Sequence, residues 1–178
     1  HIEFVVILYM EQYDAGRYFL HEHPRHATSW QFRRMVELMA LPNVELAHGD
    51  QCQYGSAARS GMRVGDPIKK PTGFLRNSPE VRKELSRRCM GKNGECSRAA
   101  GGRHVLCSSN AKDAAKYPRR LCRAMLRGIA KQGRDDSLLK DGCFGMQVRD
   151  DDADVEATIR GPAQGYSGKH KDDLTGQV

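Results

Sequence analysis

Residues 17–24 read Arg-Tyr-Phe-Leu-His-Glu-His-Pro, and this stretch decides the predicted fold. Aromatic and aliphatic residues run into a carboxylate between two imidazoles, and a proline ends the run. Gly16 separates the stretch from a segment with helical apolar spacing, residues 4–14. This order is typical of an open α/β sheet, in which ligands bind beyond the carboxyl ends of the strands. We expect a strand over residues 18–22 with Glu22 at its end; the alternative is a solvated strand end without a role.

Further helices and strands are predicted as far as residue 131. After the first strand we expect a helix capped by Thr28 and Ser29 and broken at Pro42, a strand over 44–48, a strand over 72–76, a helix begun by Ser78, Pro79 and Glu80, and a helix from Pro118 to about Lys131. A capping serine, a proline at the first helical position and an early acid are the usual start of a helix. Residues 90–115 are expected to form a loop.

Composition indicates a protein without a membrane segment. Of 178 residues, 39% are apolar and 29% charged, and no run of 18 apolar residues occurs. The chain starts with His rather than Met, so we expect it to be a piece of a longer reading frame. No signal-peptide pattern is present, and the six cysteines are irregularly spaced, so we predict an intracellular protein, nuclear or cytoplasmic, with reduced thiols.

Charge divides the sequence into two parts. Residues 1–132 carry 23 lysines and arginines against 12 acidic residues, a net charge of +11, whereas residues 133–178 carry 6 against 10, a net charge of −4. The acidic part is poor in apolar residues and is predicted to be a linker or disordered tail. The basic part indicates a polyanionic partner, and we expect nucleic acid, DNA rather than RNA. The alternative is a basic surface that serves solubility.

A basic ridge follows the last predicted helix. Arg119, Arg123, Arg127 and Lys131 recur every four residues and therefore share one helical face. Lys69 and Lys70 form a second basic element just before the strand over 72–76. We predict that both elements contact nucleic acid.

The order of motifs over residues 20–130 resembles the C-terminal half of DNA cytosine-5 methyltransferases. Glu22-His23-Pro24 stands where that family has Glu-Asn-Val or Glu-Asn-Pro, and residues 52–55 (Cys-Gln-Tyr-Gly) and 69–77 (Lys-Lys-Pro-Thr-Gly-Phe-Leu-Arg-Asn) are similar to its next element. The resemblance implies a partial Rossmann-like sheet with flanking helices and a basic insert, occupying residues 1–132. It implies that Glu22 is a catalytic residue that holds the nitrogen-3 and amino edge of a flipped cytosine. It also adds Arg76 and Asn77 to the nucleic-acid-binding residues.

The departures from that family leave the enzymatic activity uncertain. His23 replaces the family's asparagine, no cysteine follows a proline, and the glycine-rich S-adenosylmethionine loop would lie before residue 1. We therefore expect no cofactor in this stretch, with S-adenosylmethionine in the parent if that is an enzyme. Residues 16–24 and the end of the chain, residues 172–178, also resemble parts of copia-type retroelement polyproteins. The expected function is a nucleic-acid-binding, methyltransferase-like module of such a polyprotein, flanked by other polyprotein domains; the alternative is the base-binding half of an active methyltransferase.

A metal site is a separate possibility. Cys89, Cys96, His104 and Cys107 supply three thiols and an imidazole within 19 residues, a ligand set that suits tetrahedral zinc. The gaps of six and seven residues are wider than the usual two to four, so we expect free thiols and keep zinc as the alternative. His21, His23 and His26 alternate near a strand end and are a second, weaker candidate.

Overall fold

The computed structural model describes residues 1–138, all of which belong to one compact unit. Most of the predicted acidic tail, from residue 139 on, lies outside the described residues. The elements are α1 (Ile2–Asp14), β1 (Leu20–Pro24), the 3₁₀ turn η1 (Thr28–Gln31), α2 (Arg33–Met39), β2 (Glu45–Asp50), the 3₁₀ turn η2 (Gln51–Tyr54), β3 (Pro71–Arg76), α3 (Pro79–Leu85), the 3₁₀ turn η3 (Ser108–Asn110), α4 (Ala111–Ala114) and α5 (Arg119–Asp135).

The three strands form one antiparallel sheet with the order β1-β3-β2. Arg76, the last residue of β3, lies opposite both Leu20 of β1 and Glu45 of β2. β1 and β2 therefore run the same way, joined by a connection that contains α2, but β3 lies between them in the opposite direction. The predicted α/β class is confirmed. Its Rossmann-like detail is not, because no two hydrogen-bonded neighbours among the described strands are parallel.

The first strand lies two residues later than predicted. β1 covers Leu20–Pro24, so Glu22 is its third residue, opposite Phe74, and the prediction that Glu22 ends the strand is wrong. The Asn77 side chain accepts a hydrogen bond from the Phe19 N–H (2.9 Å) and donates one to the Arg17 carbonyl (2.9 Å). These bonds replace ladder bonds ahead of Leu20. The edge position of β1 allows it to end on Pro24, which has no N–H to donate.

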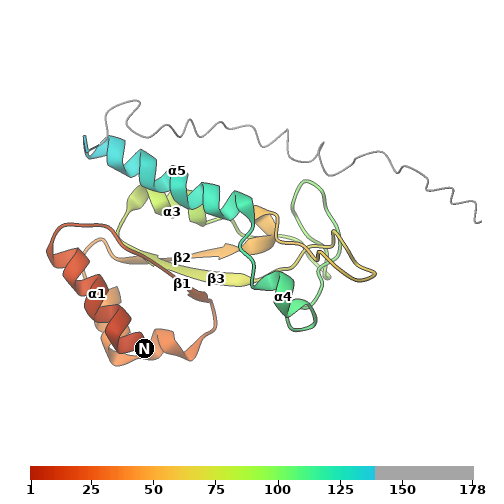
Figure 1. The fold of residues 1–178 in the computed structure, drawn as a ribbon, viewed down its shortest axis with the longest axis horizontal. Coiled ribbons are helices and arrows are strands. Elements are labelled where there is room, and N and C mark those ends of the chain that lie inside the picture. The colour runs from red at the N-terminus through yellow and green to blue at the C-terminus, as the bar shows by residue number, and fades with distance from the viewer. Residues whose placement is uncertain (139–178) are drawn as a thin grey trace, which may run out of the picture. The chain divides into compact units, whose positions relative to one another are not determined.

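Helices cover both faces of the sheet (Figure 1), with α3 and α5 on one side and α1 and α2 on the other. Successive side chains of a strand point to opposite faces, and β3 shows this clearly. Phe74 packs with residues of α3 and α5, whereas Leu75 packs with residues of α1 and α2. The α3/α5 core is Ala47, Tyr54, Phe74, Val81, Leu85, Leu121 and Ala124; the α1/α2 core is Val6, Phe19, Trp30, Met35, Leu38, Val44 and Leu75.

The helix pair α3 and α5 is close-packed at a glycine. A Cβ on Gly128 would lie 2.6 Å from the Val81 Cα, so only glycine fits there. Ser78 caps α3 as predicted, accepting a hydrogen bond from the Val81 N–H (3.2 Å). Its hydroxyl also donates to Gln132 Oε1 (2.8 Å), which ties the start of α3 to the end of α5. α5 begins after Pro118, as expected, and continues to Asp135 rather than ending near Lys131.

The helix expected after Thr28 is divided into a 3₁₀ turn and the short helix α2. Phe32, extended at φ −62° and ψ 131°, separates the two. In α2, Met35 and Leu38 are buried in the α1/α2 core, whereas Val36 is 48% exposed. None of the helices in residues 1–138 is both long and apolar enough to cross a membrane.

The stability of this fold should fall as the pH drops below about 6.5, because of His21. Its ring lies under α1, with Nδ1 3.1 Å from the Tyr9 hydroxyl and Trp30 edge-on at 5.4 Å. Burial, and then the charge of His23, lower the His21 pKa, while Glu22 acts in the opposite direction. The neutral ring is thus favoured in the fold, and the unfolded chain takes up the proton first. The contribution of His21 to stability is complete above pH 6.5 and is lost as the pH falls through the folded-state pKa of His21.

Urea unfolding followed by circular dichroism at several pH values between 5 and 8 would test this. His21→Phe should reduce the pH dependence, and His26→Asn, at an exposed site, should leave it as in the wild type. Equal slopes for the wild type and His21→Phe would show that His21 does not cause the effect.

Candidate metal centre and basic surface

Three cysteines and one histidine converge beside the end of β2. The ligand atoms of Cys52, Cys89, Cys96 and His104 all lie within 4.8 Å of one another. Cys89 Sγ is 3.9 Å from Cys96 Sγ and 3.6 Å from His104 Nε2. The three cysteines are buried and form a small cluster of their own. We call these four residues the Cys/His cluster.

Asp50 brings the first two members together. Cys52 belongs to η2, directly after β2, and Cys89 follows α3. The Asp50 carboxylate, which is 1% exposed, accepts hydrogen bonds from the Cys89 N–H (2.8 Å) and from Arg88 Nε (3.1 Å). In addition, the Asp50 N–H donates to the Arg87 carbonyl (2.9 Å). The chain leaving α3 is therefore held against the end of β2.

The other two members lie on a looped-back segment. The Cys96 N–H donates to the Gly102 carbonyl (2.8 Å), and the His104 N–H donates to the Gly94 carbonyl (2.7 Å). Between these bonds lies an isolated antiparallel bridge that pairs Glu95 with Arg103. Gly94 has a φ of +84°, a left-handed conformation that suits the turn between Cys89 and Cys96.

Hydrogen-bond donors surround the thiols. The Ser97 N–H and hydroxyl lie 3.5 and 3.6 Å from Cys89 Sγ, and Gln53 Nε2 lies 3.7 Å from both Cys52 Sγ and Cys96 Sγ. Burial raises the pKa of Cys52. Burial also acts to raise the pKa of Cys89, but hydrogen bonds from Ser97, the Gly91 backbone and Cys96 outweigh it and lower that pKa to about 6.

The observed cluster contains three of the four residues that the sequence offered as an alternative zinc site. Cys107 is exposed and is not part of it. The fourth member is instead Cys52, which lies 37 positions before Cys89. At that separation, the spacing of residues in the sequence does not indicate a shared metal site. The only hint in the sequence is its position just after a predicted strand, where the chain turns.

Two of the predicted nucleic-acid-binding residues are used inside the fold. Arg76 is 1% exposed, and its Nη2 lies 2.9 Å from Glu45 Oε2. Its Nε is buried without a partner among the described residues. Asn77 makes the two hydrogen bonds that hold the chain before β1.

The predicted basic ridge on α5 is also partly neutralised. Arg127 Nε and Lys131 Nζ lie 3.1 and 2.8 Å from the two carboxylate oxygens of Glu84 on α3. Burial acts to raise the Glu84 pKa, but the hydrogen bonds from Lys131 and Arg127 outweigh it and lower that pKa. Within residues 1–138, no ion pair involves Arg119 or Arg123, so the free part of the ridge is the start of α5.

Lys70, Tyr117 and Glu22 meet beside the start of α5. Lys70 Nζ lies 5.5 Å from the centre of the Tyr117 ring, and the Tyr117 hydroxyl donates a hydrogen bond to Glu22 Oε2. Burial and Glu22 raise the Tyr117 pKa. The other Glu22 oxygen, Oε1, is buried and has no partner in the described part of the chain. Lys69 precedes Lys70 and has no ion pair within that part. We call Lys69, Lys70, Tyr117, Arg119 and Arg123 the basic surface.

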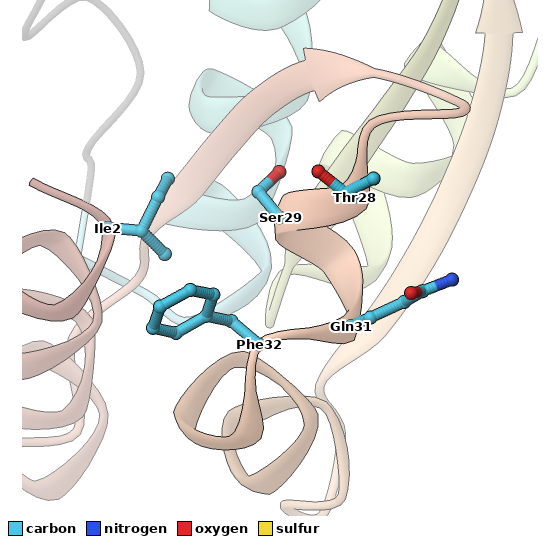
Figure 2. A pocket seen from close by; sticks show the side chains of 5 residues that line it. All are labelled: Ile2, Thr28, Ser29, Gln31 and Phe32. Atoms are coloured by element: carbon cyan, nitrogen blue, oxygen red, sulfur yellow. The ribbon is translucent and has the colours of Figure 1, made fainter.

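The structure also contains a pocket of about 400 Å³ near the start of α1. Figure 2 shows the Ile2 and Phe32 side chains lying close together on its wall. The lining residues, Ile2, Thr28, Ser29, Gln31 and Phe32, include no ionisable side chain and none of the predicted site residues. Nothing in this pocket favours catalysis.

Comparisons with known proteins do not identify a family for this chain. No protein-family model matches the chain, and neither a curated protein nor a solved structure is significantly similar to it.

Replacing Glu84 with Gln should lower the free energy of unfolding by about 2 kcal/mol, because Arg127 and Lys131 would lose their shared partner. Glu37→Gln is the control, since its ion pair with Arg33 is exposed on one face of α2 and is worth only about 0.4 kcal/mol. Chemical denaturation of both variants measures the difference. Equal losses would show that the two α5 cations do not depend on Glu84.

Proposed function

We propose that this chain is a nucleic-acid-binding module that contacts its ligand through the basic surface. The observation that carries the proposal is Lys70 lying over Tyr117 at the start of α5. Tyr117 is 45% exposed, so part of its ring is open to a base. An aromatic ring beside cations is the usual combination for holding a base and its phosphates.

The start of α5 adds further attraction for phosphate. The first turn of this 17-residue helix contains Arg119 and Arg120 and no acidic residue. N–H groups at a helix N-terminus favour an anion. The charge of Arg119 at the same end is unfavourable with the helix dipole, and a bound anion would offset it.

The distribution of acids supports the same assignment. Residues 69–131 hold 17 basic and 4 acidic side chains. Glu84 and Glu80 are paired with cations of α5 and α3, and Asp113 accepts the Arg59 N–H (2.8 Å). Three of the four acids are therefore used within the fold, and only Glu95 is an exposed acid without an ion pair in this segment, which leaves a cationic surplus on the surface.

The methyltransferase and retroelement assignments stay part of this proposal and rest on the sequence resemblance. In the alternative, Glu22 binds a target base in an S-adenosylmethionine-dependent cytosine methyltransferase whose other residues lie upstream. The observation that favours it is the unpartnered Glu22 Oε1, an acceptor beside the exposed Tyr117. Against it, the sheet described here is antiparallel, with Glu22 in the middle of a strand, so the binding module is the better supported function.

Reversing Arg119 and Arg123 to Glu should weaken DNA binding by at least tenfold at low salt, since several phosphate contacts would be lost. Fluorescence anisotropy with labelled single- and double-stranded DNA and RNA, each at several salt concentrations, measures this. The slope of log K against log salt should become shallower in the variant. Similar losses for unrelated sequences would identify phosphate contacts as the main contribution.

The matched control is Arg33→Glu with Arg34→Glu, the same charge change on α2 at the opposite face of the sheet. This control should retain most of the affinity. Binding that does not weaken as salt rises, or equal losses in the two double variants, would contradict a defined phosphate-binding surface.

Glu22→Gln separates the two functions. In the binding module, Glu22 only orients Tyr117, so Gln should leave affinity within about threefold, whereas Tyr117→Ala should reduce it by roughly tenfold through lost stacking. If Glu22 holds a base edge, Gln should remove a preference for cytosine at one position. A competition assay with oligonucleotides that differ at single positions measures that preference.

A further inference from the structure

We propose that Cys52, Cys89, Cys96 and His104 bind one structural Zn²⁺ ion. The proposal rests on the geometry of the Cys/His cluster and on no part of the proposed nucleic-acid binding. It replaces the ligand set suggested by spacing alone, because it includes Cys52 and leaves out Cys107.

The distances agree with tetrahedral zinc. With Zn–S bonds of about 2.3 Å and Zn–N bonds of about 2.05 Å, tetrahedral angles place two sulfurs about 3.8 Å apart and a sulfur and a nitrogen about 3.6 Å apart. The observed separations are 3.9 Å from Cys89 Sγ to Cys96 Sγ and 3.6 Å from Cys89 Sγ to His104 Nε2. The whole set lies within 4.8 Å, so shifts of about an ångström would complete the site.

The surroundings are those of a structural rather than a catalytic ion. Four protein ligands fill a tetrahedral site and leave no open position for water. The Ser97 N–H points at Cys89 Sγ and the Gln53 amide at the other two sulfurs, and such outer donors orient thiolates around a metal. The three thiols are buried, which separates the site from solvent.

The irregular segment around the Cys/His cluster is one that a bound metal ion would stabilise. Residues 86–107 contain no helix and no named strand, and the only buried cluster beneath this segment besides Val105 and its neighbours consists of the three cysteines. Such a long irregular segment inside a compact unit needs some other constraint. Zinc would join η2, the chain after α3 and the loop around Cys96 and His104 at one point.

A disulfide explains the cluster less well. A Cys89–Cys96 bond would need the sulfurs at about 2.05 Å, against the 3.9 Å observed. It would also leave Cys52 and His104 facing the pair without a role.

Metal analysis of the full chain is the first test. Protein purified under reducing conditions from zinc-supplemented cells should contain one zinc per chain by elemental mass spectrometry. Co²⁺ exchanged into the site should show the visible absorption of a tetrahedral complex and thiolate charge-transfer bands. Absence of both zinc and cobalt bands, or recovery of a Cys89–Cys96 disulfide under the same conditions, would overturn the proposal.

Single substitutions identify the ligands. Cys52→Ser, Cys89→Ser and Cys96→Ser should each weaken zinc binding by more than the ten- to hundredfold that loss of an outer partner causes, and Gln53→Ala should fall within about that range. Cys107→Ser and Cys122→Ser, at exposed cysteines, should bind zinc like the wild type. A Cys107→Ser loss as large as that of Cys52→Ser would overturn the proposed ligand set.

Variants that replace one ligand type with another distinguish the loss of a metal ligand from the loss of the fold. His104→Cys should retain the metal and gain thiolate charge-transfer intensity in the cobalt complex. Cys52→His should retain the metal and lose intensity. Unchanged cobalt spectra in both variants would show that these two residues are not ligands.

Discussion

The central strand β3 is the constraint on which the rest of the fold depends. β1 and β2 do not touch each other, so every ladder hydrogen bond of the sheet involves β3. Helices cover both of its faces, and Thr72, Phe74 and Leu75 are fully buried. Trp30 lies so close above Gly73 that a Cβ there would be 2.8 Å from its ring. A strand in this position has no solvent face, and its one charged residue, Arg76, needs an acid on the neighbouring strand, which Glu45 supplies.

This dependence explains which parts of the fold could be predicted from sequence. Ser78 and Pro79 start α3 through bonds made within one turn, and Pro118 precedes α5, so local chemistry suffices for both. The order of the strands is different in kind. It depends on β3 lying between β1 and β2. The sequence shows only that a helix is followed by a strand, and this order is compatible with both parallel and antiparallel pairing. The shift of β1 likewise depends on Asn77, 58 residues away from Phe19.

The candidate site follows the same division. Cys89, Cys96 and His104 lie on one segment, and hydrogen bonds within that segment bring Cys96 and His104 together. Cys52 joins them only because Asp50 at the end of β2 holds the backbone of Cys89, a contact between residues 39 positions apart. Cys107 is nearer to His104 in sequence, yet Val105 is already fixed by its bridge to Ile68 and the chain then leaves the cluster. Sequence spacing can therefore identify ligands that are close together in the chain. Whether a distant residue such as Cys52 joins the cluster depends on the arrangement of the sheet.

Several of the basic residues in this sequence are paired with carboxylates inside the fold and therefore add no positive charge to the surface. Glu45 forms an ion pair with Arg76, and Glu84 forms ion pairs with Arg127 and Lys131. The first pair links two strands of the sheet, and the others link α3 to α5. Arg119 and Arg123, which make no ion pair within residues 1–138, lie at the start of α5, next to η2. The Gly55 N–H donates to the Cys52 carbonyl (3.2 Å), and a Cβ on Gly55 would lie 3.7 Å from the Arg120 side chain. One turn of chain thus connects the Cys/His cluster to the start of α5. An ion that fixes Cys52 would also fix the turn against which Arg120 lies, at the start of the helix that carries Arg119 and Arg123.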